Sequence, residues 1–165
     1  MPVIAAKLYT VVVLFHSGKL LLLRRSSTKT FAPDQWTGIG GRVEPDEFDD
    51  LVSAAGRELF EETDLRPTEV SPLALRRTLT FYRPDEGLVT LLYFTGTTST
   101  GRPPAASEGS LAWIDPAALP EIDVIENTAR VLPLLVGDST QPAGRIRCGI
   151  ARLDGNWRLV DVAFD

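Results

Sequence analysis

The sequence predicts an α+β protein in which helices pack on a mixed sheet. Several short apolar runs separated by turn residues alternate with a few segments of helical spacing, a pattern typical of that class. The chain has 165 residues, of which 44% are hydrophobic. That is enough for one well-buried core and short for two. We therefore expect a single domain over residues 1–165.

The first half of the chain predicts strands at residues 8–15, 20–24 and 36–39, a loop at 26–35 and a helix that begins near residues 49–50. The first two strands are apolar and flank the turn residues Ser17 and Gly18, so they form a hairpin. Asp49 and Asp50 suit the start of the helix, because an aspartate can cap the first turn and its charge is favourable at the positive end of the helix dipole. Within it Leu51, Ala55 and Leu59 repeat at i, i+4 and i+8 and give an apolar stripe that packs on the sheet.

The second half predicts strands at residues 73–82, 88–97 and 110–114, helices that begin at Asp115 and span 125–136, and a closing hairpin of 145–153 and 156–163. Residues 83–87 have strong turn chemistry, and 98–107 form a surface loop rich in Thr, Ser, Gly and Pro. The pair Asp154 and Gly155 suits a type I′ turn. Cys148 stands in an apolar strand, so we expect it to be a small core residue.

Charge and composition exclude several functions. A net charge of −5 argues against binding long nucleic acid or an anionic membrane. One cysteine allows no intramolecular disulfide, and one histidine disfavours a His-rich zinc site or a Ser-His-Asp triad. The apolar runs fall far short of the ~20 residues of a membrane span, and no signal-peptide layout is present. We expect a cytoplasmic protein, as monomer or homodimer.

Three carboxylates share one face of the helix predicted after residue 49. Glu58, Glu61 and Glu62 stand at i, i+3 and i+4, and like charges at that spacing destabilise a helix by roughly 0.2 to 0.5 kcal/mol per pair. A cation offsets that cost, and hard carboxylate oxygens suit Mg²⁺, Mn²⁺ or Ca²⁺. The alternative is a solvated acidic face.

The segment around this helix resembles the Nudix box of the Nudix (MutT-like) hydrolase family. It matches GG-x5-E, from Gly40 and Gly41 to Glu47, and then R-E-L-x-E-E-x-x-L from Arg57. Nine residues separate Glu47 from Arg57 where the family usually has seven. Either Glu47 keeps its place and the loop is longer, or Asp49 takes that role. Asp64 stands where the family usually has a glycine, and Asp tolerates the left-handed cap.

The resemblance implies an α/β/α sandwich with a mixed central sheet and a pyrophosphohydrolase that uses Mg²⁺ or Mn²⁺. Glu61 and Glu62 would be metal ligands, with Glu58 as a third ligand or the general base. A backbone carbonyl of Gly40 or Gly41 would complete the coordination. Arg57 would pair with a carboxylate of the box and orient it. Glu108 aligns with a further metal-binding glutamate, although an ordinary loop acid is the alternative.

The substrate implied by the resemblance is a small nucleotide. The similarity extends to the branch that hydrolyses oxidised-purine nucleoside triphosphates, which releases the monophosphate and pyrophosphate. Residues expected at the substrate are Trp36, Thr37, Arg25, Phe81 and Asn127, each with a core or surface role as its alternative. That branch has an asparagine at the position of Thr37, so the substrate here is expected to differ. Hydrolysis of a nucleotide sugar or dinucleoside polyphosphate, and binding without cleavage, are the other hypotheses.

Overall fold

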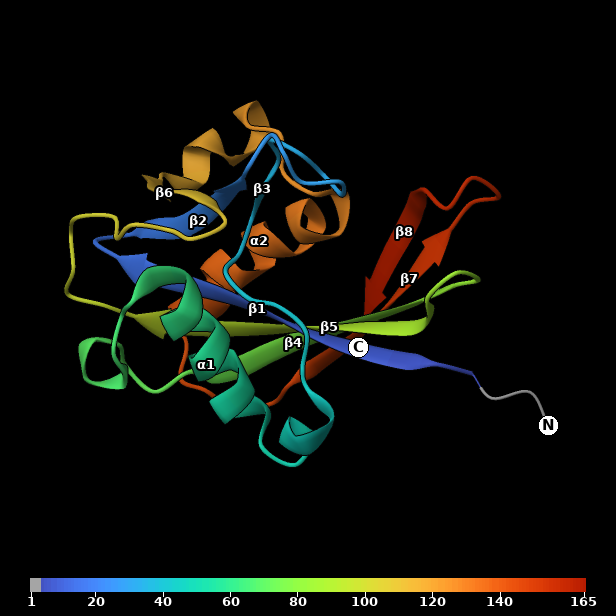
Figure 1. The fold of residues 1–165 in the computed structure, drawn as a ribbon, viewed down its shortest axis with the longest axis horizontal. Coiled ribbons are helices and arrows are strands. Elements are labelled where there is room, and N and C mark those ends of the chain that lie inside the picture. The colour runs from blue at the N-terminus through green and yellow to red at the C-terminus, as the bar shows by residue number, and fades with distance from the viewer. Residues whose placement is uncertain (1–3) are drawn as a thin grey trace.

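A computed structural model describes residues 4–165, and its centre is an eight-stranded mixed sheet (Figure 1). The strand order is β3-β2-β1-β5-β4-β7-β8, and β6 pairs with β2. The pairs β1–β5 and β4–β7 are parallel, and the others are antiparallel. The strands are β1 (Ala6–His16), β2 (Lys19–Arg25), β3 (Trp36–Thr37), β4 (Ala74–Arg83), β5 (Gly87–Thr97), β6 (Gly109–Ile114), β7 (Arg147–Leu153) and β8 (Leu159–Phe164). The predicted fold class is confirmed.

Two helices, α1 (Leu51–Thr63) and α2 (Glu126–Ser139), cover opposite faces of the sheet (Figure 1). The buried cluster on one face contains Ala55 and Leu59 of α1, and the cluster on the other face contains Leu132 and Leu135 of α2. Short 3-10 helices lie at η1 (Pro45–Glu47), η2 (Pro67–Glu69) and η3 (Pro116–Glu121). Within residues 4–165 no helix is long and apolar enough to cross a membrane.

The boundaries of α1 follow from its flanking residues. Asp50 caps the helix, because its side chain accepts a hydrogen bond from the backbone N–H of Ser53. At the other end Asp64 adopts the left-handed conformation, with φ at 56°, and its N–H donates to the carbonyl of Phe60. The aspartate at the position of the usual glycine therefore ends the helix as expected.

The chain between β3 and α1 runs along β1. Val12 and Ile39 exchange backbone hydrogen bonds at 2.6 and 2.9 Å, and Thr10 N–H donates to the carbonyl of Gly41 at 2.8 Å. Gly40 has φ at 154°, and a Cβ there would collide with the backbone carbonyl of Thr10. The glycine therefore permits a close approach, and the segment leads directly to the start of the acidic helix.

The structure corrects three expectations in the second half of the chain. Helix α2 ends at Ser139, three residues beyond the predicted end, and burial of Val131, Leu132 and Leu135 against the sheet offsets the backbone hydrogen bond that Pro133 cannot make. The closing hairpin does not have a two-residue turn: Asp154 accepts hydrogen bonds from the N–H groups of Asn156 and Arg158 and organises a longer loop.

The third correction concerns Cys148, which is exposed rather than buried. Its neighbours in β7 alternate, so that Gly149 and Ala151 are buried while Cys148 and Ile150 are exposed. The buried residues face the side that α2 covers, and the face of β7 that carries Cys148 stays open to solvent. An apolar run near the edge of a sheet therefore does not establish burial of both faces.

Candidate active site

The acidic face of α1 lies against the glycine pair. A Cβ on Gly41 would stand 2.5 Å from Oε2 of Glu58, so any larger residue there would displace the carboxylate from its present position. The carbonyl of Gly41 already accepts the hydrogen bond from Thr10. The structure thus brings Glu58 and the main chain of the predicted loop into direct contact.

Arg57 is the cation that holds the carboxylates together. Its guanidinium binds Glu47 through two hydrogen bonds, Nε to Oε1 at 2.6 Å and Nη2 to Oε2 at 2.9 Å. Its Nη1 donates to Glu58 at 2.9 Å and to Glu61 at 3.0 Å. Hydrogen bonds from Arg57 lower the pKa of Glu47 to about 2, and Glu47 in turn raises the pKa of Arg57. One arginine therefore offsets much of the repulsion on this helix face.

The ion pair between Arg57 and Glu47 shows how the loop before α1 accommodates its two additional residues. Glu47, at the end of η1, binds Arg57 with the geometry of a forked ion pair, whereas Asp49 is exposed. The backbone N–H of Glu44 also donates to Oε2 of Glu47 at 2.9 Å. Glu47 thus keeps its relation to the arginine, and the extra residues lie between η1 and α1.

Glu62 lies deeper than the other two helix glutamates. Its residue is 8% exposed, and its Oε2 accepts a hydrogen bond from the hydroxyl of Ser107 at 3.0 Å. Burial raises the pKa of Glu62, and the nearby Glu108 carboxylate raises it further. Within residues 4–165 Glu62 forms no ion pair. It is a buried carboxylate with free lone pairs.

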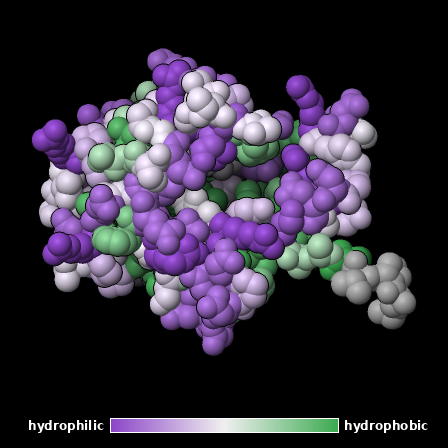
Figure 2. Space-filling view, in the orientation of Figure 1, coloured by the Kyte–Doolittle hydropathy of each residue, from purple (hydrophilic) through white to green (hydrophobic). Residues whose placement is uncertain are grey.

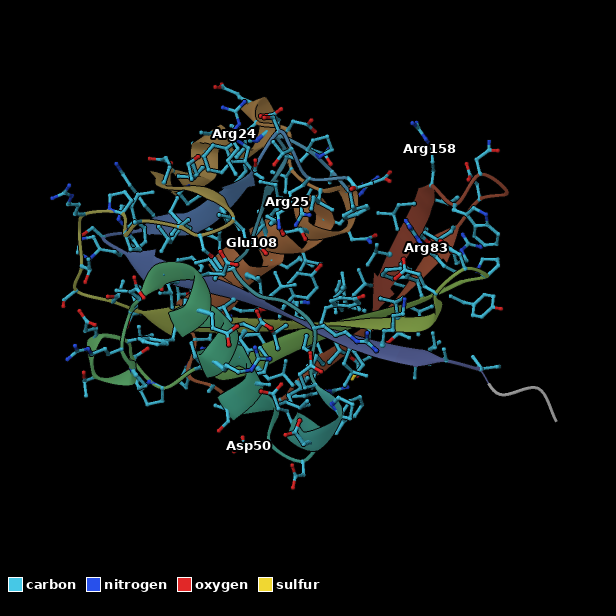
Figure 3. All side chains as sticks on the ribbon, in the orientation of Figure 1. Arg24, Arg25, Asp50, Arg83, Glu108 and Arg158 are labelled. Carbon is cyan, nitrogen blue, oxygen red and sulfur yellow. The ribbon has the colours of Figure 1, made fainter. Side chains whose placement is uncertain are left out.

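Glu108 reaches this helix from the loop before β6. Its carboxylate pairs with Lys29 at 2.7 Å, and its carbonyl accepts a hydrogen bond from Ser26 N–H at 3.1 Å. Figure 3 shows Glu108 on the same side as Arg25. The sequence did not predict Ser107 or Lys29 at the site; the only signal was that Ser107 precedes Glu108.

The donors suit a hard divalent cation. Glu58, like Glu62, has its pKa raised mainly by burial, so both carboxylates lack the full compensation that a metal would supply. Carboxylate and carbonyl oxygens are the ligands that Mg²⁺ and Mn²⁺ take. In the described part of the chain no three acidic, histidine or cysteine side chains are already gathered at metal-binding distances. Arg57 binds both Glu58 and Glu61.

Two of the residues expected at the substrate, Trp36 and Asn127, lie where β3 meets the start of α2. Trp36 is half-buried, and its backbone N–H donates to the carbonyl of Asp123 at 2.8 Å. The carbonyl of Trp36 accepts from the N–H of Ile125 at 2.9 Å, which ties β3 to the start of α2. Thr37 and Asn127, both half-buried, lie on these two joined elements.

Phe81 and Arg25 have partners within the protein. Phe81 is 7% exposed and belongs to the buried cluster under α2, with the guanidinium of Arg83 5.9 Å from its ring centre. Arg25 donates to the carbonyl of Phe31 at 3.0 Å and lies 5.7 Å from that ring. Figure 2 shows a hollow with an apolar floor and a hydrophilic rim, and Figure 3 places Arg25 and Arg83 on opposite sides of this region.

A family model for the NUDIX domain matches residues 7–135. Bovine m7GpppN-mRNA hydrolase NUDT17 is 47% identical over 47 residues, which is 28% of this chain and only 15% of that protein's length.

Two solved structures show the same fold. The mutator MutT protein from Bacillus halodurans superposes with a TM-score of 0.67 at 16% identity, over 96% of this chain and 97% of that one. A bifunctional NMN adenylyltransferase/ADP-ribose pyrophosphatase from Francisella tularensis, complexed with AMP and a manganese ion, superposes with a TM-score of 0.65 at 20% identity. That match covers 84% of this chain and 43% of the other.

Proposed function

This chain belongs to the NUDIX domain family, and from that premise we propose that it is a divalent-metal-dependent hydrolase of phosphoric anhydrides in small nucleotides. More specifically, we propose a single-domain enzyme that cleaves a purine nucleoside triphosphate to the monophosphate and pyrophosphate. The observation that carries the proposal is the gathering of Glu47, Glu58 and Glu61 around Arg57, against the backbone of Gly41, with the buried Glu62 on the same helix.

The metal-binding residues in this proposal are Glu58, Glu61 and Glu62, with the Gly40–Gly41 backbone and Glu108 beside them. Mg²⁺ or Mn²⁺ bound there would stabilise charge that develops on the phosphate oxygens and lower the pKa of the attacking water. Displacement of the Arg57 hydrogen bonds from Glu58 and Glu61 would make their oxygens available, while Glu47 keeps the guanidinium in place.

Glu58 is also the candidate for proton acceptance from the attacking water. Burial raises the pKa of its carboxyl, and a general base works best when its pKa approaches the working pH. The water oxygen would form the new bond to phosphorus, its proton would pass to a Glu58 oxygen, and the anhydride oxygen would leave with the pyrophosphate. Arg57 orients that carboxylate through its 2.9 Å hydrogen bond.

A panel of nucleoside triphosphates, nucleotide sugars and dinucleoside polyphosphates with Mg²⁺ tests the activity. Release of pyrophosphate rather than orthophosphate from a triphosphate would support the proposed cleavage. Glu61→Gln and Glu62→Gln keep the side-chain shape and remove a charge, so turnover should fall by orders of magnitude while the fold persists. Near-normal turnover in both variants, or no hydrolysis of any compound, would contradict the proposal.

Thr37 bears on base selectivity. A threonine hydroxyl offers a shorter, single-atom contact where an asparagine offers both a donor and an acceptor. A site with fewer hydrogen bonds to the base rejects the wrong base less well, so we expect only a modest preference for 8-oxo-dGTP over dGTP. Thr37→Asn should sharpen that preference, measured as the ratio of the two kcat/KM values. A strong preference already present in the parent would contradict this reasoning.

A further inference from the structure

A second charged cluster lies where β4 turns into β5. Nζ of Lys7 lies 3.3 Å from one oxygen of Glu86, and Nη1 of Arg83 lies 3.8 Å from the other. One carboxylate therefore faces two cations, and the three side chains together carry one net positive charge. Each of them is only 27% to 29% exposed, so solvent screens this charge in part.

One nitrogen of Arg83 lacks an acceptor among the described residues. Its Nε is buried and has no hydrogen-bond partner within residues 4–165. The 3.8 Å separation from Glu86 is too long for a good hydrogen bond. The guanidinium lies over the ring of Phe81, a contact that positions it without using an N–H group. Buried donors are normally paired, so this one points to an acceptor supplied by a ligand.

The cluster borders the hollow on the α2 side of the sheet. Phe81 is buried on that side, and strand alternation places Arg83 two residues on along the same face. Lys7 likewise shares the face of Tyr9, which packs against the same buried cluster. In Figure 3 Arg83 lies at the end of β4 beside the β7–β8 hairpin, across from Arg25.

We propose that Lys7 and Arg83 form an anion subsite for a phosphate of the substrate that is separate from the hydrolysed anhydride. This rests on the proposed function, because a nucleotide whose anhydride lies at the α1 glutamates has to extend through the hollow to reach this cluster. The planar fork of Arg83 matches two phosphate oxygens, and Lys7 adds a point charge. The substrate class is a purine nucleotide with a phosphate on its ribose 2′- or 3′-hydroxyl as well as the 5′-polyphosphate, so dGTP and 8-oxo-dGTP serve as probes of base selectivity alone.

Binding of three product-like ligands isolates the subsite from turnover. AMP, adenosine 2′,5′-bisphosphate and adenosine 3′,5′-bisphosphate are titrated calorimetrically into the parent and the variants Arg83→Gln, Arg83→Lys and Arg145→Gln. At least one bisphosphate should bind the parent about ten-fold more tightly than AMP does, the effect of one added charge-assisted contact. Which bisphosphate gains identifies the hydroxyl.

The variants locate the effect. Arg83→Gln should bring the bisphosphate and AMP affinities within about two-fold, while Arg83→Lys keeps the charge and part of the advantage. Arg145→Gln is the matched control, because it removes the same charge from an exposed pair between Arg145, just before β7, and Asp165, just after β8, and should keep the full advantage. Circular dichroism and thermal unfolding check that each variant folds.

The outcomes separate the two proposals. Equal binding of all three ligands by the parent, or no binding, overturns the subsite. An equal loss of AMP and bisphosphate affinity in Arg83→Gln also overturns it, because Arg83 would then contact the base or the ribose. Turnover of the nucleotide panel without a bisphosphate advantage removes the subsite alone. A bisphosphate advantage without turnover of any compound supports the subsite and removes the proposed hydrolase function.

Discussion

Arg57 is expected to stabilise the metal-free protein, because it offsets the charges of the Glu47, Glu58 and Glu61 carboxylates that it binds. In Arg57→Gln the side chain of Glu58, which is 14% exposed, loses its cation but stays largely buried. Loss of a hydrogen bond to such a charged group costs about 1.5 to 3 kcal/mol. The exposed Glu61 pair at i, i+4 adds only about 0.3 to 0.5 kcal/mol. We therefore expect these two contacts together to contribute about 2 to 3.5 kcal/mol to the free energy of unfolding, which Arg57→Gln loses.

Urea unfolding in a chelator and in excess Mg²⁺ measures this effect. If the glutamates bind Mg²⁺, the ion should restore more stability to Arg57→Gln than to the parent, because it supplies the missing positive charge. Arg152→Gln is the matched control: its pair with Asp161 is exposed, with N and O 3.6 Å apart, and its loss should change stability by less than about 0.5 kcal/mol. A chelated Arg57→Gln as stable as this control would refute the reasoning.

The same unfolding experiment at low pH should show a smaller loss of stability in Arg57→Gln than in the parent. Arg57 lowers the pKa of Glu47 from 4.5 to about 2 in the folded protein. The contribution of Glu47 is therefore fully present above pH 4.5 and is lost as the pH falls toward 2. Arg57→Gln returns this pKa toward its ordinary value, so the variant should lose less stability than the parent across that window.

The remaining predictions concern the helix and its buried carboxylate. Gly56→Ala should raise the free energy of unfolding by about 0.5 to 1 kcal/mol, because a Cβ there meets no atom within 4 Å and alanine favours the helix. Gly41→Ala should instead lower thermal stability and turnover, since its Cβ would stand 2.5 Å from Glu58. Equal melting temperatures for Gly56→Ala and Gly41→Ala would contradict this difference between the two variants. Glu62→Gln should be more stable than the parent in chelator at pH 8. Burial raises the folded-state pKa of Glu62, so the parent binds more protons when folded and loses stability as the pH rises above 4.5 through that raised pKa. A parallel pH dependence of urea unfolding in the two proteins would exclude this cause.

The helix-borne part of the site could be predicted from the sequence because it depends on local rules. Asp50, the apolar stripe and Asp64 fix the ends and the buried face of α1, and helical spacing then fixes where the glutamates point. The identity of the partner of Arg57 could not be predicted, because the loop from Glu47 has no periodicity. The structure shows that a 3-10 turn places Glu47 at the arginine despite the extra residues.

The exposure of side chains on the outer strands also could not be predicted from the sequence. An apolar run such as β7 predicts a strand, but the position of the strand in the sheet decides whether one or both faces are covered. Cys148 faces the side of β7 that no helix covers, and Phe81 faces the side under α2. Two residues of similar apolar context therefore differ in burial for a reason that lies in the topology.

Glu108 reaches the acidic helix through the sheet rather than through the loop that carries it. The pairing of β6 with β2 places Gly109 opposite Arg25, so Glu108 follows in register beside Ser26. A Cβ on Gly109 would collide with the carbonyl of Arg24, and glycine is therefore required for this close pairing. Glu108, which lies next to the metal-binding candidates, and Arg25, a candidate for the substrate, are thus placed by one ladder between β2 and β6. Because the register of that ladder fixes both, the length of the loop before β6 can vary without moving Glu108 relative to Arg25.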